Sequence, residues 1–174
     1  MTRVCLLGSE DVNLKYELLS HETSRDALAT YDLREPYDNA VALETVSLGA
    51  AVALLNDLNW YLVRFVDDVL VLEPSVSESE WLSREAATAV RDDELAPDET
   101  DRFLKIYGVE KPDYDPGSDG SGSGTDDDGP EPDRQPRLVE PMFVTRTGPE
   151  LPEYDLRDVA ETLIVRVTES EFGA

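Results

Sequence analysis

The sequence predicts an α+β (or α/β) fold: a mixed sheet of about five to six strands with helices mainly on one face, an αα-hairpin and a disordered acidic insertion. Short β-branched or aromatic runs alternate with helical 3–4 spacing over residues 1–111. Two more strand-like runs, Leu138–Thr145 and Thr162–Thr168, follow. Residues 112–136 contain no Leu, Ile, Val or Phe and are rich in Pro, Gly, Ser and Asp. Such a segment buries too little apolar surface to fold, which separates an insertion from the folded parts.

The first part of the chain alternates strand and helix patterns. Arg3–Leu7 is a short apolar run and predicts a buried strand. Asp11–Thr30 shows helical spacing that is interrupted at a capping-box pattern beginning at Thr23. Ala40–Val46 predicts a second strand, and the serine after it is a typical N-cap for an apolar helix over Leu48–Leu58.

The next stretch predicts a β-hairpin that ends before Pro74. Two β-branched or aromatic runs, Trp60–Val66 and Val69–Leu72, are separated by Asp67 and Asp68. Two polar residues between two such runs are typical of a tight hairpin turn. Both runs are therefore predicted to be strands.

An αα-hairpin is predicted after the β-hairpin. Ser77–Glu80 has the Ser-x-x-Glu pattern of a capping box, which predicts a helix that buries Trp81. A second helix is predicted from Pro97 to Tyr107, with Gly108 as its C-cap. The acidic residues of this helix pair argue against a DNA-reading helix-turn-helix, because phosphates would be repelled.

The size of the C-terminal tail predicts one domain rather than two. The tail, Arg137–Ala174, holds neither Cys nor His, and a fold of fewer than about 40 residues usually needs disulfides, a metal or a partner. We therefore expect its two strands, with a short helix at Asp155–Glu161 between them, to complete the N-terminal sheet. The predicted organisation is one α/β domain, 1–111 plus 137–174, with 112–136 as a disordered acidic linker.

The charge of the chain is strongly negative and widely spread. There are 39 Asp and Glu against 15 Lys and Arg, a formal net charge of −24, and only three of the bases are lysines. Residues 112–136 hold eight acids and one base, a net of −7, which leaves −17 outside this segment. The pattern favours adaptation to a salt-rich cytoplasm over a DNA mimic or an acidic partner of a basic protein. It also argues against nucleic-acid and anionic-membrane partners, because no basic run can bind phosphates.

Targeting signals and cysteine content favour a cytoplasmic localisation. No secretion-signal pattern is present, and the longest apolar stretch, Leu48–Leu55, is far shorter than a membrane span. The single cysteine, Cys5, lies in the first predicted strand and cannot form an internal disulfide. It is expected to be a buried thiol in a reducing compartment.

The candidate catalytic and phosphate-binding residues have simpler structural explanations. His21 is the only histidine, so a histidine metal site or a His-based catalytic pair is excluded, and a polar surface position on a helix is expected for it. Gly8–Asp11 lies between a strand and a helix, where phosphate loops occur. It lacks the glycine spacing and the lysine of such a loop, so it is expected to be an ordinary strand-to-helix turn.

Acid pairs and aromatic residues complete the list of candidates. In so acidic a chain, neighbouring acids arise without selection for a cation site. The acid pairs are Asp67/Asp68, Asp92/Asp93 and Asp126–Asp128. Trp60, Tyr61 and Trp81 could form an aromatic ligand surface, but aromatics at such positions are more often core anchors. The sequence therefore assigns no catalytic or metal-binding residue and no cofactor.

Two segments, Leu54–Glu73 and Trp81–Glu85, carry a resemblance to a known family. They read LLNDLNWYLVRFVDDVLVLE and WLSRE, and they resemble an uncharacterised protein family of halophilic archaea. The resemblance covers residues 1–111 and is weaker over the tail. It implies a salt-adapted cytoplasmic protein, and it implies no activity, cofactor or site residue.

The leading functional hypothesis is a non-catalytic protein-interaction or regulatory module, with the αα-hairpin and the linker facing an unidentified protein partner. The alternative is a small-molecule-binding or enzymatic domain whose pocket lies at the C-terminal ends of the first strands, near Gly8–Asp11 and Ser47–Gly49. Arg34, Arg64 or Arg84 converging on that pocket would indicate an anionic ligand. Acids alone would indicate a cation or an amine.

Overall fold

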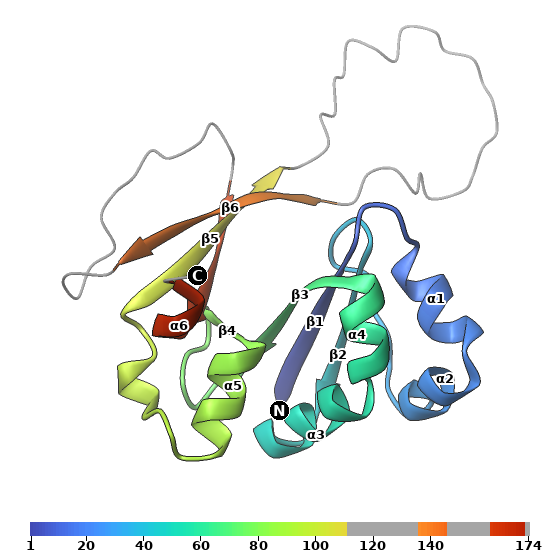
Figure 1. Cartoon of the computed structure of the whole chain (residues 1–174), viewed down its shortest axis with the longest axis horizontal. Coiled ribbons are helices and arrows are strands. Elements are labelled where there is room, and N and C mark those ends of the chain that lie inside the picture. The colour runs from blue at the N-terminus through green and yellow to red at the C-terminus, as the bar shows by residue number, and fades with distance from the viewer. Residues whose placement is uncertain (111–135, 146–160, 173–174) are drawn as a thin grey trace, which may run out of the picture.

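The computed structural model of the protein describes residues 1–110, 136–145 and 161–172, and their strands form one mixed sheet (Figure 1). The strands are β1 (Thr2–Gly8), β2 (Ala40–Thr45), β3 (Val66–Leu72), β4 (Trp81–Ser83), β5 (Phe103–Glu110), β6 (Arg137–Thr145) and β7 (Glu161–Val167). The helices are α1 (Leu14–Ser20), α2 (Glu22–Leu28), α3 (Leu48–Asp57), α4 (Asn59–Phe65), α5 (Arg84–Arg91) and α6 (Glu169–Phe172). The α+β class is confirmed. The seven strands of the described residues, in the order β2-β1-β3-β4-β7-β5-β6, exceed the five to six predicted.

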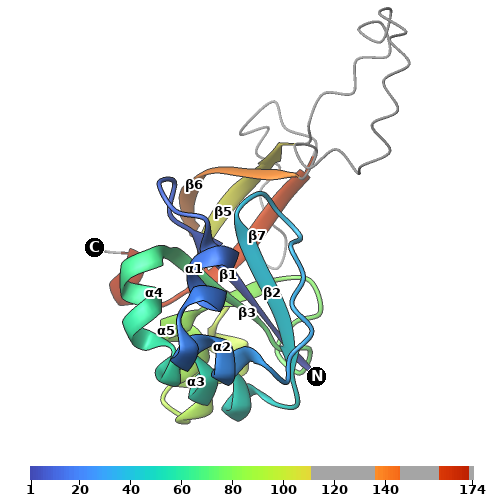
Figure 2. The same cartoon turned by 90° about the vertical axis from the view of Figure 1, so that its right-hand side faces the viewer.

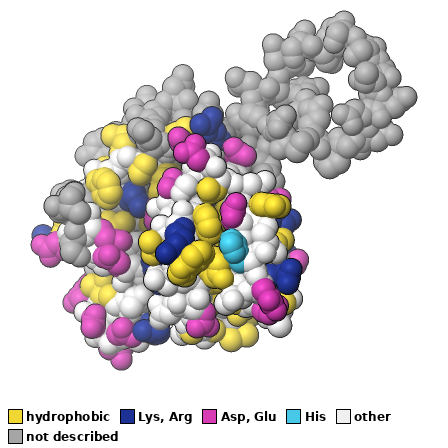
Figure 3. Space-filling model, turned by 45° about the vertical axis from the view of Figure 1, so that its right-hand side comes forward, with side chains coloured by type: hydrophobic (Ala, Val, Ile, Leu, Met, Phe, Trp, Pro, Cys, Tyr) yellow, Lys and Arg dark blue, Asp and Glu magenta, His cyan; other side chains and the backbone are white. Residues whose placement is uncertain are grey.

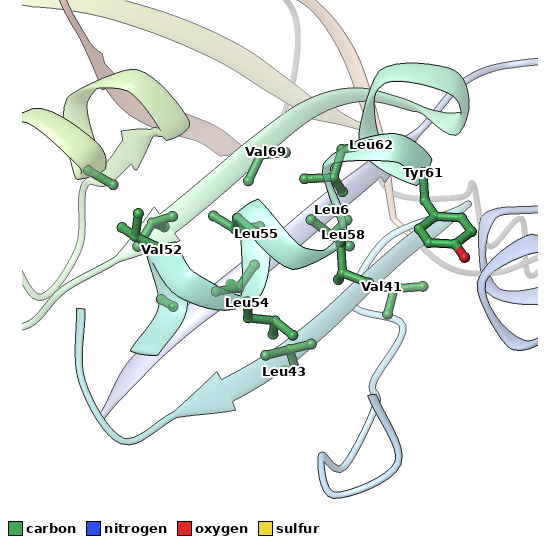
Figure 4. Packing of buried hydrophobic residues seen from close by; sticks show 14 of the residues in the cluster. Leu6, Val41, Leu43, Val52, Leu54, Leu55, Leu58, Tyr61, Leu62 and Val69 are labelled. Carbon is green, nitrogen blue, oxygen red and sulfur yellow. The ribbon is translucent and has the colours of Figure 1, made fainter. Parts of the chain in front are cut away.

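Helices cover one face of β1, β2 and β3, as predicted (Figure 2). Val4 and Leu6 of β1 point into this layer, where Leu55 of α3 and Leu62 of α4 pack in the same core cluster. Figure 4 shows leucines of α3 and α4 lying over β1, β2 and β3. Side chains alternate between the two faces of a strand, which is why every second residue of β1 joins this core.

The other face of β1 is covered by the sheet itself. Cys5 of β1 and Leu70 of β3 share a second core cluster with Tyr107 of β5 and Val165 of β7. In the strand order, β1 and β5 are separated by three strands, so this contact requires a strongly curled sheet. The curl also brings the two outer strands together at one end, where the Asp38 amide donates to the carbonyl of Pro136 over 2.8 Å.

The predicted β-hairpin is wrong in its first half. Residues 60–65 belong to helix α4, and β3 begins at Val66 and pairs antiparallel with β1. In α4 the neighbours Tyr61 and Leu62 are buried, while Trp60 and Val63 are exposed. Tyr61, Leu62 and Phe65 meet the first core from one face of this helix, so tertiary packing overrides the β propensity of the run.

The predicted αα-hairpin is also wrong. Trp81–Ser83 forms the short strand β4, and it is Ser83 that caps a helix, α5, by accepting from the Ala86 amide over 3.1 Å. Ser77 accepts from the Glu80 amide over 3.0 Å, as in a capping box, but within a turn. Residues 103–110 form β5 between β6 and β7, with Gly108 inside the strand. The strand is paired on both sides, and this pairing overrides the helical spacing of its apolar residues.

Several other predictions are confirmed. Strands β1 and β2 lie where expected, and Ser47 caps α3 by accepting from the Ala50 amide over 3.1 Å. The tail strands β6 and β7 lie in the same sheet as β1. The N-terminal helical region breaks at His21, slightly before Thr23.

Two predictions fall mainly outside the described residues. Nearly all of the predicted linker, 112–136, and the helix predicted at Asp155–Glu161 lie in the segments 111–135 and 146–160. The division into one domain with a disordered insertion therefore stays a prediction. Within the described part of the chain, no helix has the length and apolar character needed to cross a membrane.

Candidate functional site

The turn after β1 is held in one conformation by Asn39. The Gly8 amide donates to the carbonyl of Asn39 over 2.9 Å, and the Asn39 side chain accepts from the Leu14 amide and donates to the carbonyl of Ser9. Asn39 itself adopts a left-handed conformation, with φ of 55°. A Cβ atom on Gly8 would lie 2.6–2.8 Å from atoms of Asn39 and Leu14, so only glycine allows this close approach.

A cavity of about 530 Å³ opens beside this turn. Its lining includes three carboxylates, of Glu10, Asp38 and Asp67, and the guanidinium of Arg137. The phenol of Tyr107 also lines it. This charge balance suits a cation better than an anion.

The second half of the predicted pocket is elsewhere. Strands β1 and β2 are antiparallel, with Thr2 opposite Thr45, so Ser47–Gly49 lies at the end of the sheet opposite Gly8–Asp11. The prediction assumed parallel strands, whose carboxyl ends meet at one edge. A single pocket near both segments is therefore wrong.

A mostly buried polar cluster links β3 to β5 next to this cavity. The Asp68 carboxylate accepts from the Lys105 ammonium and, over 2.5 Å, from the Tyr107 hydroxyl. The Lys105 and Asp68 side chains are only 15% and 16% exposed. Burial and then the charge of Asp68 raise the pKa of Tyr107 well above its usual value, so the phenol stays a hydrogen-bond donor. Because β3 and β5 are not neighbours in the strand order, these hydrogen bonds cross the curled sheet and stabilise its curvature.

Cys5 lies fully buried in the second core, close to this cluster. Burial, followed by the negative charge of Asp68, raises the pKa of the Cys5 thiol to about 12. The thiolate is the reactive form of cysteine, so this thiol is inert in the folded protein.

We expect Cys5 to react with iodoacetamide at pH 8 only when the protein unfolds. The unfolded chain loses the thiol proton from about pH 8.5 upward, whereas the folded chain keeps it until about pH 12. The raised pKa therefore contributes to the free energy of unfolding. This contribution is complete below about pH 8.5 and is lost as the pH rises toward 12. Mass spectrometry across a urea titration measures the fraction of Cys5 that is labelled. Labelling of the native protein as fast as free cysteine would contradict the prediction.

Exposed aromatic and apolar side chains gather on the outer face of α1 and α4. This α1–α4 surface consists of Trp60, Val63, Arg64 and Phe65 of α4 and of His21, the residue that follows α1. Trp60 is 50% exposed and Val63 is 71% exposed. Figure 3 shows hydrophobic side chains around basic ones and beside the single histidine on this side of the molecule.

Stacking contacts order the α1–α4 surface. The Arg64 guanidinium lies 3.8 Å from the centre of the Trp60 ring, and its Nη1 donates to the Trp60 carbonyl over 2.9 Å. The His21 ring stacks on Phe65 with 5.9 Å between centroids and meets Trp60 edge-on at 6.0 Å. Glu17 lies 3.6 Å from the His21 ring nitrogen. These contacts join the exposed Trp60 ring to Arg64 and His21.

The aromatic residues and arginines singled out in the sequence do not converge. Tyr61 is buried in the first core, and Trp81 packs against the second, on the other face of the sheet from Trp60. Arg84 donates to Asn59 over 2.8 Å, whereas Arg34 lines a cavity whose lining does not include Arg84. His21 is half-buried between α1 and α2, so it is less exposed than a helix surface position implies.

Several of these acids have structural partners. Asp67 accepts from the Ser9 hydroxyl over 2.9 Å, and Asp92 pairs with Arg91 over 2.8 Å. Asp126–Asp128 lies outside the described residues. Among residues 1–110, 136–145 and 161–172, no group of three or more His, Cys, Asp or Glu side chains could hold a metal ion.

Sequence comparisons place the chain in a family. Neither a curated protein nor a solved structure matches it. The profile of a family described as a family of unknown function (DUF5804) matches residues 2–109, more than half of the 174 residues, from β1 to the end of β5. The chain therefore belongs to this family of unknown function, DUF5804.

Proposed function

We propose that the protein is a non-catalytic protein-interaction module and that its partner docks on the α1–α4 surface. The observation that carries this proposal is Trp60, a half-exposed indole that contacts Arg64 and His21. Tryptophan and arginine are the residue types that most often dominate binding energy at protein interfaces. Exposed apolar side chains that gather on one face, rather than occurring singly, mark interaction sites.

The charge of the α1–α4 surface indicates the chemistry of the partner. The arginine of this surface, Arg64, belongs to a chain with a net charge of −24, and Lys15 of α1 is already paired with Glu35 over 3.9 Å. A partner surface with apolar side chains flanked by carboxylates would complement it. Nucleic acids and anionic membranes are disfavoured, because the rest of the chain would repel them.

We also infer that the protein works in the salt-rich cytoplasm of a halophilic organism. The high acid content, the scarcity of lysine and the resemblance to a family of halophilic archaea support this inference. Concentrated salt screens repulsion between charges beyond about 3 Å at 1 M and leaves apolar contacts intact. A docking surface built on Trp60 and Val63 would therefore remain effective in such a cytoplasm.

A photo-crosslinking amino acid placed at Val63 is expected to capture one protein partner in cells. The control carries the same amino acid at Val46, a valine 79% exposed that lies outside α1 and α4. We expect a specific heterologous crosslink from position 63 and none from position 46. Mass spectrometry of the crosslinked peptides identifies the partner and the contacting segment.

Two outcomes would overturn the proposal. Crosslinks to the chain itself from position 63, together with a dimer in sedimentation velocity, would make the α1–α4 surface a self-association interface. Equal crosslinking of the same proteins from positions 63 and 46 would show that exposure alone produces the signal. A crosslinked segment that presents carboxylates around an apolar residue supports the proposed partner chemistry.

A further inference from the structure

A second cavity, of about 470 Å³, lies on the side of β1 and β2 that the helices leave uncovered. Tyr37, Ala42 and Trp81 line it and pack against the second core, and Tyr31, which packs against the first core, also lines it. Its volume lies in the range of small-molecule sites, about 300–1,000 Å³. The cavity is separate from the α1–α4 surface, so what it binds does not depend on the proposed function.

The shape of this cavity suits a flat ring. Tyr31, Tyr37 and Trp81 are all half-buried and line the same space, to which β2 contributes Ala42 together with Leu43 and Glu44. Aromatic side chains hold planar ligands by stacking or edge contacts with ring centroids about 4.5–7 Å apart. A small residue beside large rings leaves room for such a ligand rather than filling the space with core.

Two arginines reach the same cavity, each in an exposed ion pair. Arg3 lies 3.1 Å from Glu44, and Arg34 lies 3.9 Å from Asp32. All four side chains are at least 45% exposed, and exposed ion pairs add little stability. An anionic group on a ligand can therefore replace either carboxylate at little cost, with Arg34 the more available because its pair is the looser.

The charge balance separates this cavity from the two others described. Its two arginines match two carboxylates, whereas the cavity beside Gly8 has three carboxylates against one arginine, and a third, of about 730 Å³, has five against one. In a chain of −24, it is the one of these three that does not repel an anion. The combination of rings and guanidinium groups is typical of sites for aromatic anions.

We propose that this cavity binds a planar aromatic molecule that carries an oxyanion. The ring lies between Tyr37 and Trp81 over Ala42, and its carboxylate or phosphate pairs with Arg34 and Arg3. The carboxylate and phosphate forms share this chemistry, so indole-3-acetate and adenosine monophosphate serve as probes for the two sources.

Saturation-transfer NMR and calorimetry on the full chain test the proposal. We expect at least one of the two probes to bind with a Kd of about 1 mM or lower. Cyclohexylacetate, which has the anion without a planar ring, and tryptamine, which has the ring with a cation, are each expected to bind at least about tenfold more weakly. The preferred probe shows whether the natural ligand carries a carboxylate or a phosphate.

Matched variants locate the binding. Arg34→Gln is expected to weaken the bound probe about tenfold, whereas Arg64→Gln, on the α1–α4 surface, leaves it unchanged. Ala42→Leu fills the space between the rings and should abolish binding, and circular dichroism checks its fold. The proposal is overturned if neither probe binds, if tryptamine binds as well as indole-3-acetate, or if the two arginine variants behave alike. Binding of the probes only at the α1–α4 surface would overturn the proposed cavity site and would not contradict the proposed docking of a protein partner.

Discussion

Replacing Asp68 by alanine is expected to lower the free energy of unfolding by about 3 kcal/mol. The substitution leaves Lys105 and Tyr107 without the carboxylate they share, and breaking a buried pair costs about 3–5 kcal/mol. The lower end of that range applies because the Asp68 and Lys105 side chains keep 16% and 15% exposure. The substitution also removes the hydrogen bonds that connect β3 to β5 across the curled sheet.

The neighbouring aspartate provides the control. Asp67 is exposed, and its carboxylate accepts a hydrogen bond from the exposed Ser9 hydroxyl, so Asp67→Ala should change the free energy of unfolding by less than about 1 kcal/mol. Urea titrations at constant high KCl measure both variants, because urea leaves the ionic strength unchanged. Equal effects of the two substitutions would show that the cluster around Asp68 does not stabilise the fold.

Lowering the KCl concentration from about 1 M to about 0.1 M is expected to destabilise the protein severely. The distance over which charges interact grows from about 3 Å to about 10 Å in that range, and the chain carries −24. Repulsion among the acids then opposes a fold whose net stability is of the usual order of about 5–15 kcal/mol. We expect the urea midpoint to fall with each step in salt and the fold to be lost at the lowest concentrations.

A charge-reduced variant isolates the electrostatic cause. It replaces four exposed acids outside the cavities and the α1–α4 surface, namely Glu22→Gln, Asp26→Asn, Asp57→Asn and Glu78→Gln. Its urea midpoint should depend less steeply on KCl than that of the natural chain. A midpoint independent of KCl in the natural chain would contradict the inferred adaptation to a salt-rich cytoplasm.

The parts of the fold that could be predicted from the sequence are those set by local patterns. The strands predicted at Arg3–Leu7 and Ala40–Val46 form as β1 and β2, and Ser47 caps a helix, because apolar runs and a capping side chain act within a few residues. The tail strands were placed in the sheet by a size argument, which the pairing of β7 with β4 and β5 satisfies. The disorder predicted for 112–136 lies almost entirely beyond the described residues.

The parts that failed depend on contacts distant in sequence. Trp60–Val66 has the composition of a strand, but Tyr61 and Leu62 are buried in the core and Phe65 packs against it from one face of a helix. Residues 103–109 fit a helix by spacing until β6 and β7 are known to pair on both sides. Tertiary packing decides such short, strongly apolar runs, which local propensity leaves ambiguous.

The candidate sites were only partly predictable. The predicted pocket rests on the C-terminal ends of the first strands, and a cavity lies beside Gly8, but Ser47–Gly49 lies elsewhere because β1 and β2 run antiparallel. The α1–α4 surface could not be predicted, because the sequence predicts a strand where helix α4 forms. One signal was present: Arg64 follows Trp60 by four residues, the spacing that places both side chains on one helix face.

The most direct test of the docking surface is the affinity of the captured partner for two valine variants. Val63→Ser removes an apolar side chain from the α1–α4 surface, and Val46→Ser removes one of similar exposure elsewhere. We expect the first to raise the Kd about tenfold, as measured by calorimetry at high KCl, and the second to leave it unchanged. Equal affinity of both variants and the natural chain would show that the partner binds elsewhere.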